Sequence, residues 1–246
     1  ALERGIERIH RTFADNVKSG RSTAERAEAA LTGLRSATEM QLLSDVDLVI
    51  EAAYETMEVK QAIFGELDGL LKPGAILASN TSYLDLDRIA AATQRPQDVV
   101  GLHFFSPANI MKLLEIVRGS DTAPDVLATA LALAKRIGKV AVVAANAWGF
   151  IGNRMLIVRR REAEAMVVEG ATPGQVDGVL EAFGFPMGAL RVSDLAGLDL
   201  GWSAETSTGA TLRERLCEAG RRGQKTNAGF YDYLEDRKPS FSPEAE

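Results

Sequence analysis

The chain has 246 residues, 46% of them apolar and 25% charged, which is typical of a folded globular protein and excludes a disordered, collagen-like or disulfide-rich one. A net charge of −6 argues against non-specific nucleic-acid binding, and no apolar run approaches the roughly 18 residues of a membrane-spanning helix. The single cysteine, Cys217, excludes an intrachain disulfide and favours a reducing compartment, so we expect a cytoplasmic protein without a membrane span.

Residues 1–17 begin directly in helical periodicity, since apolar side chains recur at steps of three and four. The polar run 18–25 interrupts this pattern, and Ser22 or Thr23 can cap a second helix. Short apolar runs rich in β-branched residues then alternate with amphipathic segments, which predicts a mostly parallel sheet covered by helices. The expected strands are 46–50, 75–79, 99–105, 112–117 and 139–145, and the expected helices between them are 57–71, 85–93 and 123–137.

The pattern changes after residue 145, where strand signals stop and helical periodicity takes over. One long helix is expected over 149–169, and the Thr172-Pro173 pair, a cap followed by proline, opens another that reaches about residue 183. Helical signals continue to residue 219, while the end of the chain is polar and contains two prolines. The predicted organisation is an α/β domain over 1–145, an all-α domain over 146–234 and a linker over 235–246.

A sheet of this kind commonly binds a nucleotide through a glycine-rich loop between its first strand and first helix. The 22 glycines of this sequence form no G-x-G-x-x-G, no Walker A motif and not even a G-x-G pair. Either the fold is not a dinucleotide-binding one, or its first strand, loop and helix are not in this chain. The helical start at Ala1 favours the second alternative.

His103 is the more promising of the two histidines, because it lies in a predicted strand, whereas His10 lies on the polar side of the first helix. His103 is either a core histidine bonded to backbone or a general base, a role for which histidine is commonly used. Glu115 interrupts the apolar run KLLEIV, where a carboxylate is costly unless it has a partner. If the two strands are neighbours, Glu115 can hold the imidazole by its other nitrogen, as the carboxylate of a catalytic triad does.

Two further polar segments are candidates for ligand contacts. Asn80-Thr81-Ser82 follows a predicted strand at the end where open α/β sheets bind ligands, although the same residues suit a turn with a helix cap. Asn153-Arg154 lies near the start of the long helix, where a cap or a surface arginine is the alternative.

Five strings of the sequence stand out: DLVIEAAYE (47–55), ILASNTS (76–82), GLHFFSPANIMKLLEIV (101–117), GFIGNR (149–154) and GQKTNAGFYDY (223–233). Together they resemble the 3-hydroxyacyl-CoA dehydrogenase family, and the resemblance extends from Ala1 to about Glu246. The most specific part is the histidine of the third string with its glutamate twelve residues later. The resemblance implies a Rossmann-type, mostly parallel NAD-binding sheet, here lacking its first strand–loop–helix, followed by an all-α C-terminal domain.

By this resemblance the chain oxidises the L-3-hydroxyl group of an acyl-CoA and transfers the hydride to NAD+, with no metal in the site. His103 corresponds to the general base that takes the hydroxyl proton, and Glu115 to the carboxylate that stabilises the imidazolium. Ser82 and Asn153 correspond to the polar groups that hold the substrate near its 3-oxygen. The cofactor side comprises Glu55, Lys60 and Asn80, near the NAD ribose and nicotinamide, and Ser106, where asparagine or serine is usual.

The resemblance also bears on partners, of which acyl-CoA is the expected small molecule; no nucleic acid is expected. The tail resembles the segment that leads into a second helical repeat in multifunctional fatty-acid oxidation proteins. The apolar helix faces of 149–219 are therefore expected to pack against such a repeat or to form a homodimer. The alternative, favoured by the absent glycine loop, is a non-catalytic acyl-CoA-binding or dimerisation fragment that has lost its NAD site. A third hypothesis is that the chain is a relative that acts on another 3-hydroxy acid.

Overall fold

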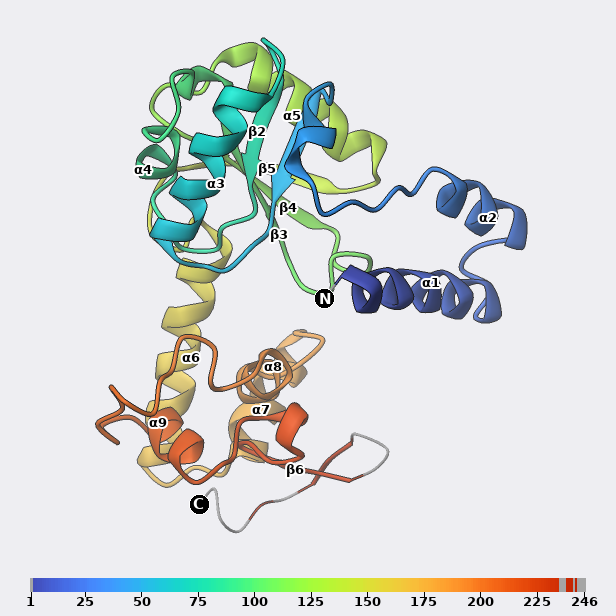
Figure 1. The fold of residues 1–246 in the computed structure, drawn as a ribbon. Helices are drawn as coiled ribbons and strands as arrows, with labels where there is room; N and C mark the ends of the chain where they lie inside the picture. Colours follow the sequence, from blue (N-terminus) through green and yellow to red (C-terminus); the bar gives the residue numbers. More distant parts are fainter. Residues whose placement is uncertain (1, 235–237, 241, 243–246) are drawn as a thin grey trace. The chain divides into compact units, whose positions relative to one another are not determined.

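The computed structural model describes residues 2–234, 238–240 and 242, and the chain divides into two compact units, Ala1–Trp148 and Gly149–Glu246 (Figure 1). The first unit is built on one sheet with helices, and the second is mainly helical. The predicted fold class, a mostly parallel α/β sheet followed by an all-α domain, is confirmed.

The elements of the first unit follow the predicted order with small shifts at their ends. The fourth helix differs most, because it ends at Ala90 rather than at Thr93: Ala92 and Thr93 donate to carbonyls only three residues back, which closes a tight turn. The helices are α1 (Leu2–Lys18), α2 (Ala24–Thr32), α3 (Met57–Leu70), α4 (Leu86–Ala90) and α5 (Pro124–Arg136), with 3₁₀ turns at Met40–Leu43 and Pro96–Asp98. The strands are β1 (Leu48–Glu51), β2 (Ile76–Ser79), β3 (Val99–Phe104), β4 (Leu113–Arg118) and β5 (Val140–Ala145).

The described residues of the first unit form a five-stranded sheet in the order β1-β2-β3-β4-β5. All neighbouring strands run parallel except β3 and β4, which are antiparallel. In that antiparallel pair Gly101 lies opposite Val117, and His103 lies opposite Glu115. Because residues that oppose one another in a sheet point to the same face, this register brings His103 and Glu115 together.

Helices cover both faces of the sheet. α5 packs on one face, where its apolar side chains form a buried cluster with alternate residues of β3 and β4, among them Leu102 and Ile116. α3 and α4 lie together on the other side (Figure 1). His103 and Glu115 alternate with Leu102 and Ile116 along their strands, so they point away from α5.

α1 and α2 form a helical hairpin that precedes the sheet. Thr23 caps α2, because its hydroxyl oxygen accepts the backbone N–H of Arg26, as one of the two predicted alternatives requires. None of the described residues of α1 is buried, and Ala27 is buried in α2. The hairpin therefore contributes little to the core of the unit.

In the second unit the helix predicted from Thr172-Pro173 to about residue 183 is confirmed, whereas the predicted helix before it and the helical run after it are longer than the helices observed. α6 begins at Gly152 rather than at 149, because Gly149 and Phe150 have φ angles of 70° and 48°, which a right-handed helix excludes. α7 ends at Phe183 as predicted, where Gly184 has a φ of 117°, but the helical run predicted from there to 219 is interrupted over 197–211. The helices are α6 (Gly152–Val168), α7 (Pro173–Phe183), α8 (Ala189–Ala196) and α9 (Leu212–Glu218), followed by a 3₁₀ turn at Gln224–Thr226 and the strands β6 (Asp232–Tyr233) and β7 (Pro239–Ser240).

The tail 235–246, which the sequence predicts to be a linker, folds back where the structure describes it. β7 pairs with β6, with Tyr233 opposite Pro239. The Ser242 hydroxyl is buried and accepts a hydrogen bond of 2.6 Å from the Arg221 guanidinium. Backbone pairing and a buried hydrogen bond thus hold these residues on the helical unit; residues 235–237, 241 and 243–246 lie outside the described ones.

Two buried carboxylates connect the elements of the second unit. Asp194 in α8 accepts the backbone N–H groups of Phe230 and Tyr231 and the hydroxyl of Tyr233. Asp177 in α7 accepts two backbone N–H groups of α8 and the Tyr231 hydroxyl. Burial raises the pKa of Asp194 to about 6, and its hydrogen bonds only partly offset this effect. The segment 230–233 is thereby tied to α7 and α8.

Candidate active site

The carboxyl ends of β1, β2 and β3 meet at one edge of the sheet, because these three strands run parallel. Glu51 ends β1, Ser79 and Asn80 stand at the end of β2, and His103 is the penultimate residue of β3. Polar and charged side chains therefore converge where open α/β sheets bind ligands.

His103 and Glu115 form a buried hydrogen-bonded pair. The His103 Nδ1 and Glu115 Oε2 atoms are 2.7 Å apart, and the two residues are 4% and 0% exposed. A carboxylate against Nδ1 favours the tautomer with a proton on that nitrogen, so proton exchange with a substrate falls to Nε2. Such a pair can act as a general base with an orienting carboxylate.

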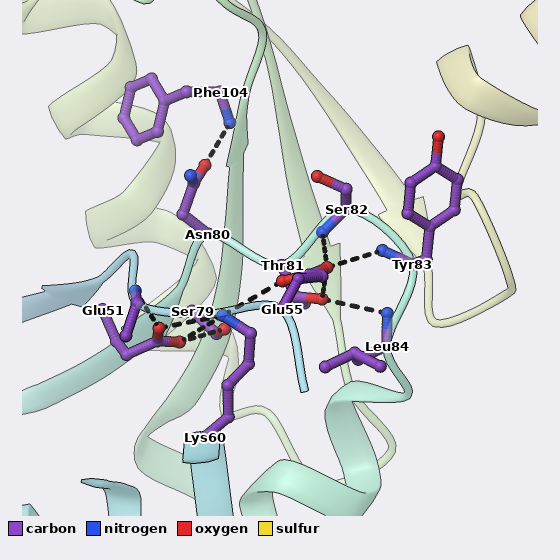
Figure 2. Close-up of polar contacts among 11 residues, drawn as sticks. Glu51, Glu55, Lys60, Ser79, Asn80, Thr81, Ser82, Tyr83, Leu84 and Phe104 are labelled. Atoms are coloured by element: carbon purple, nitrogen blue, oxygen red, sulfur yellow. Dashed lines mark hydrogen bonds and ion pairs between the residues drawn. The ribbon is translucent and has the colours of Figure 1, made fainter. Parts of the chain in front are cut away.

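Asn80 connects the end of β2 to the residue after His103 (Figure 2). Its side-chain oxygen accepts the backbone N–H of Phe104 at 2.8 Å. With the oxygen engaged in this way, the amide nitrogen of Asn80 is the atom that can donate to a ligand. Asn80 therefore fixes the strand end that carries His103.

A buried lysine joins two carboxylates beside the ends of β1 and β2 (Figure 2). Lys60 is in the first turn of α3. Its Nζ atom lies 2.9 Å and 3.0 Å from the two Glu51 carboxylate oxygens and 3.2 Å from Glu55 Oε2. The Lys60 side chain is 1% exposed, so its ammonium binds protein carboxylates rather than water. Glu51 also accepts the Ser79 hydroxyl at 2.8 Å and the Ala53 N–H at 2.6 Å.

Glu55 holds the turn that follows β2. Its Oε1 atom accepts the Thr81 hydroxyl and the Ser82 N–H, both at 2.6 Å, and the Tyr83 N–H at 3.2 Å. Burial by itself raises the pKa of Glu55, but these hydrogen bonds and the Lys60 ammonium outweigh it and hold the pKa below its ordinary value. Glu55 is therefore ionised near neutral pH, with 38% of its side chain exposed.

The remaining predicted residues lie in three different places. Ser82 is half-buried in the turn after β2, whereas Ser106 is exposed on the loop after β3. Ser106 also lines a groove of about 480 Å³ between that loop and α1. Asn153 lies at the start of α6 in the second unit, so the first unit alone does not bring it to His103.

Glu51 and Ser79 were not predicted to belong to the site. Both are buried, and both are hydrogen-bonded in the network around Lys60. The sequence does contain a signal for the ion pair of Glu51 and Lys60. Glu51 comes directly after the apolar run 46–50, and Lys60 lies on the apolar side of an expected helix, so each charge needs a buried partner.

Among residues 2–234, 238–240 and 242, no group of three or more histidine, cysteine, aspartate or glutamate side chains is arranged to hold a metal ion. In the same part of the chain, no helix combines the length and the apolarity that crossing a membrane requires.

Protein-family models match nearly the whole chain. The model for the NAD binding domain of 3-hydroxyacyl-CoA dehydrogenase matches residues 1–147, and the model for its C-terminal domain matches residues 149–233. The two matches meet where the structure divides into its two units.

Individual relatives agree with these matches. The peroxisomal bifunctional enzyme of Danio rerio is 46% identical over 225 residues, which are 83% of this chain and 31% of the fish protein. The crystal structure of M. tuberculosis FadB2 matches with a TM-score of 0.88 at 38% identity, over 95% of this chain and 87% of that one. The 3-hydroxybutyryl-CoA dehydrogenase of Escherichia coli matches with a TM-score of 0.87 at 36% identity, over 97% of this chain and 53% of that one. The chain thus spans about a third of the length of the curated relatives it matches.

Proposed function

This chain belongs to the 3-hydroxyacyl-CoA dehydrogenase family, and we propose that it oxidises L-3-hydroxyacyl-CoA to 3-ketoacyl-CoA with NAD+ in fatty-acid β-oxidation. The observation that carries the proposal is the buried His103–Glu115 pair near the carboxyl edge of the sheet. A binding module has no need of a base paired with a buried carboxylate, whereas alcohol oxidation requires one group that takes up the hydroxyl proton.

The proposed reaction removes a proton from the 3-hydroxyl oxygen and a hydride from C3, which leaves a 3-ketone. His103 takes the proton at Nε2, because Nδ1 is bonded to Glu115. The carboxylate opposite the ring stabilises the imidazolium that forms. A base positioned in this way contributes roughly 10²–10⁴-fold to the rate. When bound, NAD+ accepts the hydride from C3.

Ser82 and Asn153 are proposed to hold the 3-oxygen of the substrate through hydrogen bonds. Ser82 suits this role because Glu55 fixes its backbone N–H, while Asn80 fixes the neighbouring strand end. The groove beside Ser106 is a suitable place for the polar part of an acyl-CoA, since α1 lines its other wall with arginine, threonine and asparagine side chains.

The residues present fit one side of an NAD site. Glu55 and Asn80 offer a carboxylate and an amide donor at the parallel-strand edge, and these can hold a ribose hydroxyl and the nicotinamide. Lys60 is buried between Glu51 and Glu55, so we propose that it contributes to this side of the NAD site indirectly, by holding Glu55 in place. The pyrophosphate is commonly held by a glycine loop at a helix N-terminus, and residues 1–246 contain no G-x-G-x-x-G.

The absent loop favours a second candidate, a non-catalytic acyl-CoA-binding or dimerisation fragment. Formation of NADH from an L-3-hydroxyacyl-CoA by the full-length protein distinguishes the two. Turnover that is lost in His103→Ala supports the dehydrogenase. Acyl-CoA binding without turnover, measured by calorimetry, supports the fragment. Substrates of different chain length, and other 3-hydroxy acids, then define the substrate class.

The helical unit carries an apolar face that we propose is covered by a second helical repeat or by a second copy of the chain. Met155 on α6 and Val179 and Phe183 on α7 are 69%, 70% and 83% exposed. A groove of about 550 Å³, lined mainly by apolar side chains, runs between the same two helices. Exposed apolar surface of this kind is typical of an interface.

The cytoplasmic location predicted from composition stays a prediction. The relative from Danio rerio is named a peroxisomal enzyme and that from Brassica napus a glyoxysomal protein. Cell fractionation of the full-length protein decides between the cytoplasm and such an organelle.

A further inference from the structure

A glutamate and a lysine with almost no exposed surface face each other at the end of β1 (Figure 2). The side chains of Glu51 and Lys60 are 2% and 1% exposed, and the ammonium lies within 3.0 Å of both carboxylate oxygens. The Ser79 hydroxyl and the Ala53 N–H donate to the same carboxylate. Replacing a buried ion pair with apolar side chains often costs no stability, so stability alone does not account for this pair.

A second carboxylate connects this pair to the turn that carries Ser82. The Lys60 Nζ atom lies 3.2 Å from Glu55 Oε2, while Oε1 of Glu55 accepts the N–H groups of Ser82 and Tyr83. The ammonium is thus shared between Glu51, which is buried at the strand end, and Glu55, which holds the turn.

The turn is also fixed at its beginning. Asn80 accepts the N–H of Phe104, the residue after His103. The segment around Ser82 is therefore held to the strand of His103 at one end and to Lys60, through Glu55, at the other. A displacement of Lys60 changes the place of Ser82 relative to His103.

We propose that Glu51 is a positioning residue for the dehydrogenase reaction: it anchors the Lys60 ammonium, which places Glu55 and, through it, the backbone of Ser82. This inference rests on the proposed function, in which Ser82 holds the 3-oxygen of the substrate. Glu51 is assigned no contact with substrate or cofactor, because its side chain is 2% exposed. The geometry of a reacting complex is sensitive to displacements of about 1 Å, which can cost about 10²-fold in rate.

Three variants of the full-length protein test the inference: Glu51→Gln, Lys60→Met and the double variant. Glu51→Gln leaves the buried Lys60 ammonium with Glu55 alone, and Lys60→Met leaves the buried Glu51 carboxylate without its ammonium. Both single variants are expected to lower the melting temperature, whereas the double variant removes both buried charges and recovers stability. We expect kcat to stay about 10²-fold low in the double variant, with the KM for acyl-CoA little changed, because Glu55 has lost its ammonium partner. Recovery of kcat together with stability would overturn the inference.

Asp68 and Arg95 provide a matched control in the same unit. Arg95 Nε lies 3.1 Å from Asp68 Oδ1, and the two side chains are 13% and 15% exposed. Neither residue belongs to the site. Asp68→Asn and Arg95→Met are therefore expected to lower the melting temperature and to leave kcat unchanged, which separates loss of an ion pair from loss of positioning.

Amide hydrogen exchange gives a second readout that needs no turnover. The N–H groups of Ser82 and Tyr83 both donate to Glu55, so their exchange rates report directly on these two hydrogen bonds. We expect faster exchange at these two amides in Glu51→Gln and in the double variant than in the wild type, and no change in the Asp68 and Arg95 variants. An inactive wild-type protein contradicts the proposed function alone, whereas unchanged exchange at these amides in Glu51→Gln contradicts the positioning role of Glu51.

Discussion

His103 and Glu115 stand directly opposite each other across the antiparallel β3–β4 pair, with Nδ1 and Oε2 2.7 Å apart. The strand register fixes this contact, because the pairing of Gly101 with Val117 two residues away puts both side chains on the same face. A slip of one residue would turn the carboxylate to the opposite face, towards α5. The whole β3–β4 ladder, and not only its own hydrogen bond, therefore maintains the pair.

We expect His103→Ala to lower kcat by about 10²–10⁴-fold, because the base that takes the hydroxyl proton is lost. Glu115→Gln should also lower kcat, since a neutral amide does not stabilise the imidazolium. Steady-state NADH formation at saturating acyl-CoA measures both effects. His10→Ala is the control, because His10 is exposed on α1 and lies outside the site. Wild-type turnover in His103→Ala would remove the proposed mechanism.

Gly101 occupies a position where a side chain does not fit. A Cβ atom there would lie 2.6 Å from the Val117 Cβ atom, which is closer than carbon atoms pack. Gly101→Ala is expected to destabilise the fold by about 1–3 kcal/mol. It should also lower kcat, because β3 must move away from β4 only two residues from His103.

Gly69→Ala is the matched control for this substitution, since a methyl group at Gly69 in α3 meets open space. It should leave kcat unchanged and stabilise the protein by up to about 1 kcal/mol, as alanine does in helices. Thermal melts and steady-state kinetics of both variants measure the difference. Identical melting temperatures for Gly101→Ala and the wild type would contradict the close contact.

The apolar runs were enough to predict each strand from β1 to β5 within two residues, because buried strands have a distinctive composition. Thr172 was predicted as a cap for an equally local reason, and it forms a capping box with Gln175. The start of α6 could not be predicted, since phenylalanine has no local preference for the positive φ of Phe150. The tail that contains Ser242 could not be predicted to fold back onto the helical unit, because Ser242 is held by Arg221, which is distant from it in sequence.

The same distinction holds for the site. The contact between His103 and Glu115 could be predicted, because both lie in consecutive apolar strands and a buried carboxylate needs a partner. The sequence also shows that Glu51 and Lys60 each need a partner, but not that they are partners of one another. Only the packing of α3 against the end of β1 brings these two charges together.

Residues 1–246 alone are expected to bind NAD+ at least about tenfold more weakly than the same residues preceded by a G-x-G-x-x-G strand–loop–helix, a loss of at least about 1.4 kcal/mol. The reason is that backbone N–H groups of such a loop and helix hold the pyrophosphate. Calorimetry with NAD+ on both proteins measures the two affinities. Equal affinities would place all cofactor contacts within residues 1–246.

Asp194 makes the stability of the helical unit depend on pH. Burial raises its pKa in the folded protein to about 6, above the ordinary value of 3.8. The folded state therefore binds a proton more tightly than the unfolded state does. The contribution of this proton to stability is complete below about pH 4 and is lost as the pH rises through about 6. A pKa of about 6 in place of 3.8 corresponds to a free energy of about 3 kcal/mol.

Asp194→Asn removes this titration. Relative to the wild type, the free energy of unfolding of the variant should rise by up to about 3 kcal/mol between about pH 4 and pH 7, whatever its absolute value. Urea unfolding of both proteins at several pH values measures this difference. A difference that does not change with pH would show that the folded protein does not raise the pKa of Asp194.

The apolar face of α6 and α7 should make residues 1–246 self-associate. Light scattering at tens of micromolar is expected to detect a dimer or a larger species, because Val179 and Phe183 are 70% and 83% exposed. Val179→Lys and Phe183→Glu should reduce the association, whereas Leu131→Glu, on the exposed side of α5, should not. A monomeric wild type that binds no hydrophobic dye would show that this face is already covered.

The donors that satisfy Asp194 stand late in the chain, 36 to 39 residues after it, at Phe230, Tyr231 and Tyr233. On the ribosome, α8 emerges well before these residues exist, and a carboxylate buried without its donors is costly. Asp194 must then stay in water, and the core of the unit cannot close until Tyr233 has left the exit tunnel. A chain cut before Phe230 is therefore expected to leave α8 unpacked, although α6 to α9 are complete in sequence.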